Sequence, residues 1–329
     1  MRQPPILPTP TGTSLAGKTI IITGGTSGLG FETSRHFLTL KAARVIITAR
    51  DQKRGQEAVS ALRADPEVKA ANPSAVIEAF DLDLEDYQSG LEFSKRVKRE
   101  VPELDVLVCN GGVNIMNYQK SKSGHERVMQ VNCYTHFLIS LELLPLLQAT
   151  AAKRGSASRL NFVGSGTQYH HSLKKTPLSE GENFLAHFDD QRLYSGLTRY
   201  SDSKLVVNAF IRCLAEIVPS SEVIVNNSCP GMLSTGFNRN LPLWLKPLVY
   251  TMNKMLARTT EDGARTVINA SAVAGRETHG RFLQSNAVDT KASFLDGDTG
   301  NAFMRRFWKD MVEDLAQVDK TLEHFSHQM

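Results

Sequence analysis

Short apolar runs and longer amphipathic stretches alternate along the first part of the chain. Residues 19–22 form a β-branched apolar run that ends at a glycine-rich turn, and residues 44–48 form a second such run. Runs of this kind are typical of strands that are buried on both faces of a parallel sheet. Between them, Phe31, Phe37, Leu38 and Leu40 can be placed on one helical face. The pattern therefore predicts a βαβ unit at the start of the chain.

The same alternation continues to residue 227. Further strands are predicted at residues 75–80, 104–109, 159–163 and 223–227, and further helices at residues 52–64, 84–100, 128–147 and 201–217. This regular succession favours an α/β fold, in which a single doubly wound parallel sheet carries helices on both faces, the Rossmann fold. Near the end of the chain, Phe303, Phe307 and Trp308 beside Arg305 and Arg306 predict a surface helix packed on the body.

No linker rich in Gly, Ser or Pro interrupts this series, so residues 18–329 are predicted to form a single domain. Residues 1–17, which are polar and rich in Pro, Thr and Gly, are expected to be an N-terminal surface tail. Two stretches break the rhythm, at residues 166–199 and 232–260, and both are candidate substrate loops because loops after strand C-termini border the ligand crevice. Within the second, residues 241–256 have an amphipathic pattern that fits core packing, a lid or contact with a membrane surface.

The composition limits the possible binding partners more than it limits the possible folds. The 329 residues carry a formal net charge of +4, with Lys and Arg scattered along the chain, so no nucleic-acid partner is expected. The four cysteines show no CxxC spacing, which favours free buried thiols in a reducing compartment and gives no reason to expect a metal site. The most apolar stretch, residues 137–152, contains Glu142 and Pro145 and is too short to span a bilayer. Because the N-terminus lacks the apolar core of a signal peptide, a cytoplasmic protein without an integral membrane segment is the simplest expectation.

A glycine-rich segment lies directly between the first predicted strand and the first predicted helix. It reads Thr-Gly-Gly-Thr-Ser-Gly-Leu-Gly over residues 23–30. Glycine lets the main chain approach a ligand closely, and the N-terminus of a helix attracts anions. Alone, such a run can be a plain structural turn, but its place ahead of βα units favours a pyrophosphate site. The residues predicted to bind the cofactor here are Thr23, Gly24, Ser27, Gly28, Leu29 and Gly30.

The residue that follows the second predicted strand bears on cofactor choice. Dinucleotide folds that prefer NAD usually carry an acid at this point, for the adenosine ribose hydroxyl. This chain has Arg50, and Asp51 comes one position too late for the usual acid. Because an arginine can bind a ribose 2′-phosphate through two hydrogen bonds, NADP(H) is the predicted cofactor. The alternative is that Arg50 only ends a strand in solvent, which leaves the cofactor preference open.

Tyr200 and Lys204 lie four residues apart in the predicted helix 201–217 and its first turn, so both can lie on the same helical face. A phenol with a pKa near 10 is a poor acid–base catalyst at neutral pH, but a neighbouring ammonium lowers that pKa. This spacing is common by chance, and alone it is better explained as an exposed helix pair. Together with the glycine-rich segment it becomes specific.

With both motifs present, residues 18–235 resemble the short-chain dehydrogenase/reductase family, and in particular its NADP-preferring, retinol-dehydrogenase-like members. The family's Thr-Gly-x-x-x-Gly-x-Gly turn is matched without exception by Thr23, Gly24, Gly28 and Gly30. Two positions depart from the family segment Asn-Asn-Ala-Gly, because this chain has Cys109 and Gly111 in Cys-Asn-Gly-Gly. Gly164 replaces the serine that precedes the family's catalytic serine.

The resemblance implies a role for each matching position. Ser165 is expected to orient the substrate oxygen, and Asn132 to hold through its carbonyl a water that links Lys204 to solvent. Lys204 would also hold the ribose. The further cofactor contacts implied are Asp83 and Leu84 at the adenine, Asn110 and Gly111 near the adenosine ribose, and Pro230, Gly231 and Thr235 at the nicotinamide. Asp81 and Leu82 are a competing alignment for the adenine pair, which the distance to the next helix disfavours.

The activity implied is an NADP(H)-dependent reduction of a carbonyl, or oxidation of an alcohol, on a fairly apolar small molecule. Tyr200 would donate the proton to the carbonyl oxygen, or accept it in the reverse direction. Two alternatives stay open, namely non-redox dehydration or isomerisation on the same fold, and a dinucleotide-binding regulator without turnover. A homo-oligomer is expected by analogy with the family alone. The histidines that follow Ser165, His170 and His171, are expected to be solvated loop residues.

Overall fold

The computed structural model describes residues 3–233 and 257–328. Residues 241–256, whose amphipathic pattern left three interpretations open, and Thr235 lie outside the described residues. Most of the second candidate substrate loop therefore lies outside them as well.

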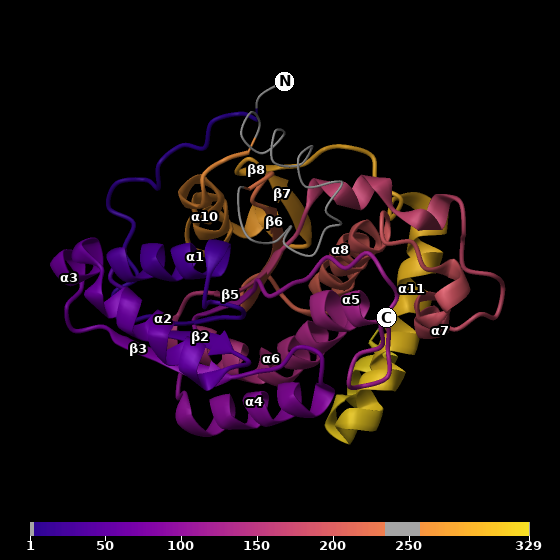
Figure 1. Cartoon of the computed structure of the whole chain (residues 1–329), viewed down its shortest axis with the longest axis horizontal. Helices are drawn as coiled ribbons and strands as arrows, with labels where there is room; N and C mark the ends of the chain where they lie inside the picture. The colour runs from indigo at the N-terminus through magenta and orange to yellow at the C-terminus, as the bar shows by residue number, and fades with distance from the viewer. Residues whose placement is uncertain (1–2, 234–256, 329) are drawn as a thin grey trace.

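Within the described residues, eight strands form one sheet in the order β3-β2-β1-β4-β5-β6-β7-β8 (Figure 1). Neighbouring strands are parallel except for the last pair, β7 and β8, which is antiparallel. The prediction of a doubly wound, mostly parallel sheet is confirmed. The strands are β1 (Thr19–Ile22), β2 (Arg44–Ala49), β3 (Val76–Asp81), β4 (Val106–Cys109), β5 (Ser158–Val163), β6 (Val223–Cys229), β7 (Arg281–Gln284) and β8 (Ala287–Val288).

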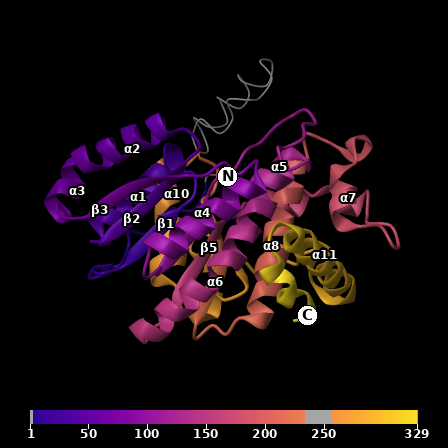
Figure 2. The same cartoon turned by 90° about the horizontal axis from the view of Figure 1, so that it is seen from below.

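Helices cover both faces of the sheet (Figures 1 and 2). One buried cluster joins the sheet to α1, α2, α3 and α10, and the other joins it to α4, α6, α8 and α11. The described helices are α1 (Gly28–Thr39), α2 (Gln52–Ala64), α3 (Pro66–Ala71), α4 (Tyr87–Glu100), α5 (Arg127–Met129), α6 (Thr135–Arg154), α7 (Phe184–Asp189), α8 (Arg199–Ile217), α10 (Thr260–Ile268) and α11 (Gly297–Val318). Among the described residues, no helix is both long and apolar enough to cross a membrane.

The central strand β1 shows why the apolar runs become strands. Ile20, Ile21 and Ile22 are all fully buried. Side chains alternate across a strand, so Ile21 packs in the cluster with α4 and α6, whereas Ile20 and Ile22 pack in the cluster with α1 and α2. Because both faces are covered, the strand is apolar throughout rather than alternating.

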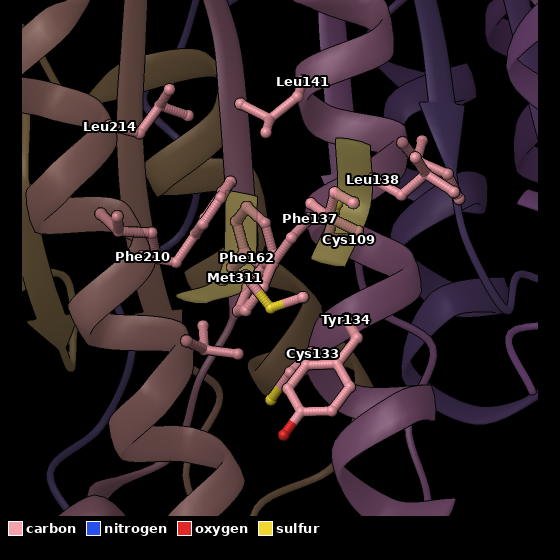
Figure 3. Packing of buried hydrophobic residues seen from close by; sticks show 14 of the residues in the cluster. Cys109, Cys133, Tyr134, Phe137, Leu138, Leu141, Phe162, Phe210, Leu214 and Met311 are labelled. Carbon is pink, nitrogen blue, oxygen red and sulfur yellow. The ribbon is translucent and has the colours of Figure 1, made fainter. Parts of the chain in front are cut away.

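Aromatic side chains fill the space between the sheet and the helices α6, α8 and α11 (Figure 3). Phe137 of α6 stacks on Phe210 of α8 with ring centres 4.0 Å apart, and Phe162 of β5 lies against both rings. From α11, Phe307 packs on Phe137, and Trp308 stacks on Phe210. The predicted C-terminal helix is therefore present, with its aromatic face buried in the core. All four cysteines are free and buried, as the sequence predicted.

Two predicted helices differ from the observed ones. The predicted helix 84–100 begins later, at Tyr87, because the Asp86 carboxylate accepts a hydrogen bond from Gln88 N and caps the helix there. The predicted helix 128–147 is interrupted by a π-helical turn, Gln130–Tyr134, between α5 and α6. Such turns are frequent at functional sites.

Candidate active site

The predicted site residues follow the carboxyl ends of successive parallel strands, so they lie along one edge of the sheet. The residues that follow β1 to β6 in this way are Thr23, Arg50, Asp83, Asn110, Ser165 and Pro230. This is the edge at which ligands bind in open α/β sheets. Tyr200 and Lys204 reach it from the first turns of α8.

Several positions of the glycine-rich turn require glycine, and Gly24 and Gly30 illustrate the two reasons. Gly24 has a φ of +66°, in the left-handed region that side chains disfavour. At Gly30, an added Cβ would lie 2.5 Å from the carbonyl oxygen of Gly24, so the turn and the helix could not pack as closely. The main chain of the turn therefore folds back on the first turn of α1.

Thr23 ties this turn to the end of β4. Its Oγ1 accepts hydrogen bonds from Asn110 N at 2.8 Å and from Gly111 N at 3.0 Å. In return, the Asn110 side chain donates to the carbonyl oxygen of Thr23 at 2.8 Å. Asn110, which was predicted to lie near the ribose, thus also fixes the shape of the glycine-rich turn.

His136 supports the same cluster and was missed by the sequence reasoning. This fully buried histidine of α6 places its Nε2 2.9 Å from Thr23 Oγ1. Burial lowers the pKa of His136 to about 3, so the ring is neutral. Thr23 Oγ1 already accepts two amide hydrogens, so its own proton can go to His136 Nε2 or, at 3.4 Å, to the carbonyl of Val108. The available signal was the spacing of His136 four residues after Asn132, which is weak without the fold.

The turn offers a suitable cradle for the phosphates of a dinucleotide. Ser27, the N-cap of α1, makes no side-chain hydrogen bond to the helix, and the first turn of α1 contains no acidic residue. The amide groups at this helix end and its dipole therefore favour an anion. At Gly111, an added methyl group would lie 2.4 Å from Leu84 Cδ1. The family's alanine would therefore fit there only with a shift of the Leu84 side chain.

Arg50 and Asp83 lie beside each other at the adenosine end of the edge. The side chain of Arg50 is 55% exposed, and its guanidinium lies 3.4 Å from Glu85 Oε1. Burial acts to raise the pKa of Asp83. The 2.7 Å hydrogen bond from Lys122 Nζ and other contacts have a larger opposite effect, so the pKa of Asp83 lies below its ordinary value. Among the described residues, Arg50 thus makes one long ion pair and is exposed enough to bind a phosphate. Of the competing pair, Leu82 is buried in the core.

The catalytic candidates Ser165, Tyr200 and Lys204 come together where β5 meets α8. Lys204 Nζ donates a 2.8 Å hydrogen bond to the carbonyl of Val163 and lies 5.4 Å from the centre of the Tyr200 ring. A hydrogen bond between Ser165 and Tyr200 acts to lower the pKa of Tyr200. Ser165 Oγ also accepts from Thr167 N at 3.2 Å and from Thr167 Oγ1 at 3.0 Å.

The electrostatics of this group differ from the sequence expectation in one respect. Lys204 was expected to lower the pKa of Tyr200, but burial raises that pKa well above its ordinary value of 10.0, and the hydrogen bond with Ser165 offsets only part of the effect. Burial also lowers the pKa of Lys204 to about 8. In this structure the phenol is therefore protonated at neutral pH, which is the form that a proton donor needs.

Asn132 lies in the π-helical turn and links two parts of the site through its side chain. Its Oδ1 accepts from Val113 N at 2.8 Å, and its Nδ2 donates to Val113 O at 3.0 Å and to Ser203 Oγ at 3.0 Å. Val113 belongs to the loop after β4, and Ser203 precedes Lys204. Asn132 therefore joins this loop to the catalytic helix, in addition to any role of its carbonyl.

Gly164 is explained by its neighbour on the next strand. A Cβ at Gly164 would lie 1.9 Å from Oδ1 of the fully buried Asn227. The serine that the family usually has at this position could not fit beside Asn227. The small residue at 164, next to Ser165 in the chain, therefore leaves the space that the Asn227 side chain occupies.

The first candidate substrate loop, 166–199, contains a helix that the sequence did not predict, α7. Tyr194 OH donates to the carbonyl of Ile115 at 2.7 Å, which ties this segment to the loop after β4. His170 is exposed, as expected, but the expectation for His171 was wrong. His171 is buried against Phe294 with ring centres 4.8 Å apart, and burial lowers its pKa to about 4.

Comparisons with known proteins establish the family. A sequence model described as short chain dehydrogenase matches residues 18–168. The short chain dehydrogenase sor7 of Hypocrea jecorina is 59% identical over 292 residues, which cover 88% of this chain and 81% of that protein. The chain belongs to the short-chain dehydrogenase/reductase family. Another member, the short chain dehydrogenase macD of Penicillium terrestre, is 37% identical over 317 residues, and the match covers 96% of each chain.

Solved structures of this short-chain dehydrogenase/reductase fold are also similar. A protein from Mycobacterium paratuberculosis has a TM-score of 0.65 at 22% identity, covering 92% of this chain and 95% of that one. The NADP complex of RhlG from Pseudomonas aeruginosa has a TM-score of 0.60 at 24% identity, covering 82% and 95%. At such identities the likeness shows the fold alone. The retinol-dehydrogenase-like subgroup stays a prediction.

Proposed function

We propose that this short-chain dehydrogenase/reductase is an NADP(H)-dependent oxidoreductase that reduces a carbonyl, or oxidises the matching alcohol, on a fairly apolar small molecule. The main support for the proposal is that Ser165, Tyr200 and Lys204 lie close together, at the same edge of the sheet as the glycine-rich turn. A nicotinamide cofactor, when bound, supplies or accepts the hydride. The residues proposed to hold it are those of the turn, together with Asp83, Leu84, Asn110, Gly111, Tyr200, Lys204, Pro230, Gly231 and Thr235.

In the reducing direction, Tyr200 OH donates its proton to the substrate oxygen. Ser165 Oγ, anchored by Thr167, orients that oxygen and stabilises the charge that develops on it. The charged Lys204 ammonium stabilises the phenolate left on Tyr200, because opposite charges nearby favour the ionised form. Asn132 holds the π-helical turn against the catalytic helix, and its carbonyl is proposed to bind the water that returns a proton to the pair.

Arg50 supports NADP(H) over NAD(H). Its guanidinium is exposed at the end of β2, where a ribose 2′-phosphate would bind, and its ion pair with Glu85 is long, at 3.4 Å. The similar structures include an NADP complex and, for a 7α-hydroxysteroid dehydrogenase, an NADH complex, so they do not decide the choice. The proposal therefore depends on Arg50 itself.

Two exposed apolar side chains lie close in sequence to the catalytic and nicotinamide segments. Leu197, three residues before Tyr200, is 76% exposed, and Met232, just after the nicotinamide segment, is 38% exposed. We propose that they contact the substrate, because small-molecule sites are lined mainly by apolar side chains. We further propose a cytoplasmic location, since buried free thiols fit a reducing compartment. A homo-oligomer stays a prediction, which light scattering of the purified protein would test.

The direct test is to incubate the protein with NADPH deuterated at the transferred position and with a panel of apolar ketones. Deuterium at the carbinol carbon of the product alcohol is the expected result. A product formed without oxidation of NADPH would favour dehydration or isomerisation instead. NADPH binding without any product from the panel, and from the matching alcohols with NADP⁺, would favour a regulator.

A further inference from the structure

The N-terminal segment, expected to be a surface tail, contacts the loop that follows β6. The side-chain amide of Gln3 makes two hydrogen bonds with the main chain of Met232. Its Nε2 donates to Met232 O at 3.0 Å, and its Oε1 accepts from Met232 N at 2.9 Å. The amide thus pairs with Met232 as a neighbouring strand would. In Figure 1 this segment is the indigo trace that leads from the N label toward α1.

Arg258 also binds both the N-terminal segment and the loop that follows β6. This residue is only 9% exposed, and its NH2 donates to Pro4 O at 2.7 Å and to Ser285 Oγ at 2.9 Å. Its NH1 lies 3.4 Å from Pro230 O, and its main-chain N donates to Met232 O at 2.8 Å. The guanidinium therefore joins the N-terminal segment, the nicotinamide segment and the turn between β7 and β8.

An apolar anchor keeps the segment in place. Ile6 is 6% exposed, whereas the next residue, Leu7, is 76% exposed. Burial of this isoleucine side chain removes apolar surface from water and so stabilises the observed position of the segment. The polar contacts of Gln3 and Pro4 therefore do not have to hold the segment alone.

Gly231 shows how closely the two parts pack. It has a φ of +82°, and an added Cβ would lie 2.2 Å from Gln3 Oε1 and 2.7 Å from Arg258 NH1. Gln3 and Arg258 thus cover the outer side of the segment that the family resemblance places at the nicotinamide. The adenosine end, at Arg50 and Asp83, follows other strands.

We infer that Gln3 and Arg258 are positioning residues, which hold Pro230, Gly231 and Met232 in the conformation that binds the nicotinamide half of the cofactor. They act on this segment through hydrogen bonds to the main chain of Pro230 and Met232. The inference rests on the proposed function, because it assigns a role to the same cofactor site. It implies that loss of the Gln3 contacts weakens binding of the nicotinamide half and leaves binding of the adenosine half unchanged.

The experiment compares wild type, Gln3→Ala, a deletion of residues 2–7 and the control Leu7→Ala, which changes an exposed side chain of the same segment. Each protein is titrated with NADPH and with adenosine 2′,5′-bisphosphate, which represents the adenosine half alone. Turnover of a ketone substrate is measured alongside, and thermal unfolding checks each fold.

Loss of two neutral hydrogen bonds is expected to weaken NADPH binding of Gln3→Ala by about 10-fold and to lower kcat, with a larger effect in the deletion. Binding of adenosine 2′,5′-bisphosphate is expected to stay at the wild-type value in Gln3→Ala, as are all properties of Leu7→Ala. Equal NADPH affinity and turnover in wild type and Gln3→Ala would overturn the inference, as would equal losses for both ligands. Wild type that binds no NADPH would overturn both this inference and the proposed function.

Discussion

Lys204 Nζ donates a 2.8 Å hydrogen bond to the carbonyl of Val163, the last residue of β5. This contact fixes the ammonium two residues from Ser165 and 5.4 Å from the centre of the Tyr200 ring. The lysine is thus held by a hydrogen bond to the end of β5, two residues before the catalytic serine. Its charge can therefore act on the phenolate without competing with a substrate for the phenolic oxygen.

The pH dependence of reduction follows from this buried lysine. Burial lowers the pKa of Lys204 to about 8, so the ammonium loses its charge as the pH rises through that value. We predict that kcat for carbonyl reduction falls above about pH 8, because the phenolate left on Tyr200 is then no longer stabilised. A pH–rate profile with saturating NADPH measures this.

Lys204→Arg is the matched variant for the profile, since a guanidinium stays charged in this range. Its profile is expected to stay flat where that of wild type falls, with binding of NADPH checked at each pH. The same alkaline fall in both proteins would assign the titration to another group.

The cofactor preference is expected to depend on Arg50. Hydrogen bonds to a charged group contribute about 1.5–3 kcal/mol, so Arg50→Ala should raise the KM for NADPH by about 10- to 100-fold. The KM for NADH should change little, because NADH lacks the 2′-phosphate. Steady-state kinetics with both cofactors measure the ratio. Arg99→Ala, an exposed arginine at the far end of α4, is the control. A wild-type preference for NADH, or an equal loss for both cofactors, would contradict the NADP(H) assignment.

Gly164 and Asn227 are predicted to be energetically coupled. Gly164→Ala places a methyl group 1.9 Å from Asn227 Oδ1 and should destabilise the protein by about 1–3 kcal/mol, the usual cost of overpacking. In the Asn227→Ala background the same substitution should cost much less, which a double-mutant cycle of unfolding free energies measures.

Gly166→Ala serves as the control for this cycle, because the nearest atom to its Cβ would lie at an ordinary 3.6 Å. Its effect is expected to be small in both backgrounds. Additive effects of Gly164→Ala and Asn227→Ala would show that the two positions do not interact.

A partly buried histidine outside the site is predicted to make stability pH-dependent. His125 Nδ1 lies 2.7 Å from Asp189 Oδ2, and its Nε2 lies 3.4 Å from Asp314 Oδ1. Burial alone would lower the pKa of His125, but hydrogen bonds and charge attraction to these two carboxylates raise it from 6.5 to about 9. Because the folded protein binds this proton more tightly than the unfolded chain does, protonation of His125 stabilises the fold. This stabilisation is fully present below pH 6.5 and is lost as the pH rises through about 9.

His125→Asn should therefore lower the unfolding free energy by on the order of 2–3 kcal/mol below pH 6.5 and by much less above pH 9. Denaturant unfolding at the two pH values measures the difference. His170→Asn, at an exposed histidine, should show no such dependence. A His125→Asn effect that is the same at both pH values would contradict the raised pKa.

Most of the sheet could be predicted from the sequence because its strands are buried runs of apolar residues. The observed bounds of β1 are those of the predicted strand, and β5 differs by one residue at its start. The strand β7 escaped notice, since its two buried residues lie between Arg281 and Gln284. The helix α10 and the antiparallel strand β8 were not predicted either. They lie beyond residue 227, where the regular alternation of apolar and amphipathic stretches ends.

The family motifs are the basis of the predicted site. The contacts that support this site join residues that are far apart in the sequence. Thr23 and His136 are 113 positions apart, and Gln3 and Met232 are 229 apart. No local pattern reports such pairs. The π-helical turn at Asn132 was hidden for another reason, because its residues continue the apolar pattern of an ordinary helix.

The central claim is that Tyr200 transfers the proton during carbonyl reduction. Its most direct test is kcat of Tyr200→Phe for a ketone that wild type reduces with NADPH, measured together with NADPH affinity. We predict that kcat falls by about 10²- to 10⁴-fold, the usual contribution of a general acid, while NADPH still binds with roughly wild-type affinity. A kcat equal to that of wild type would contradict the account.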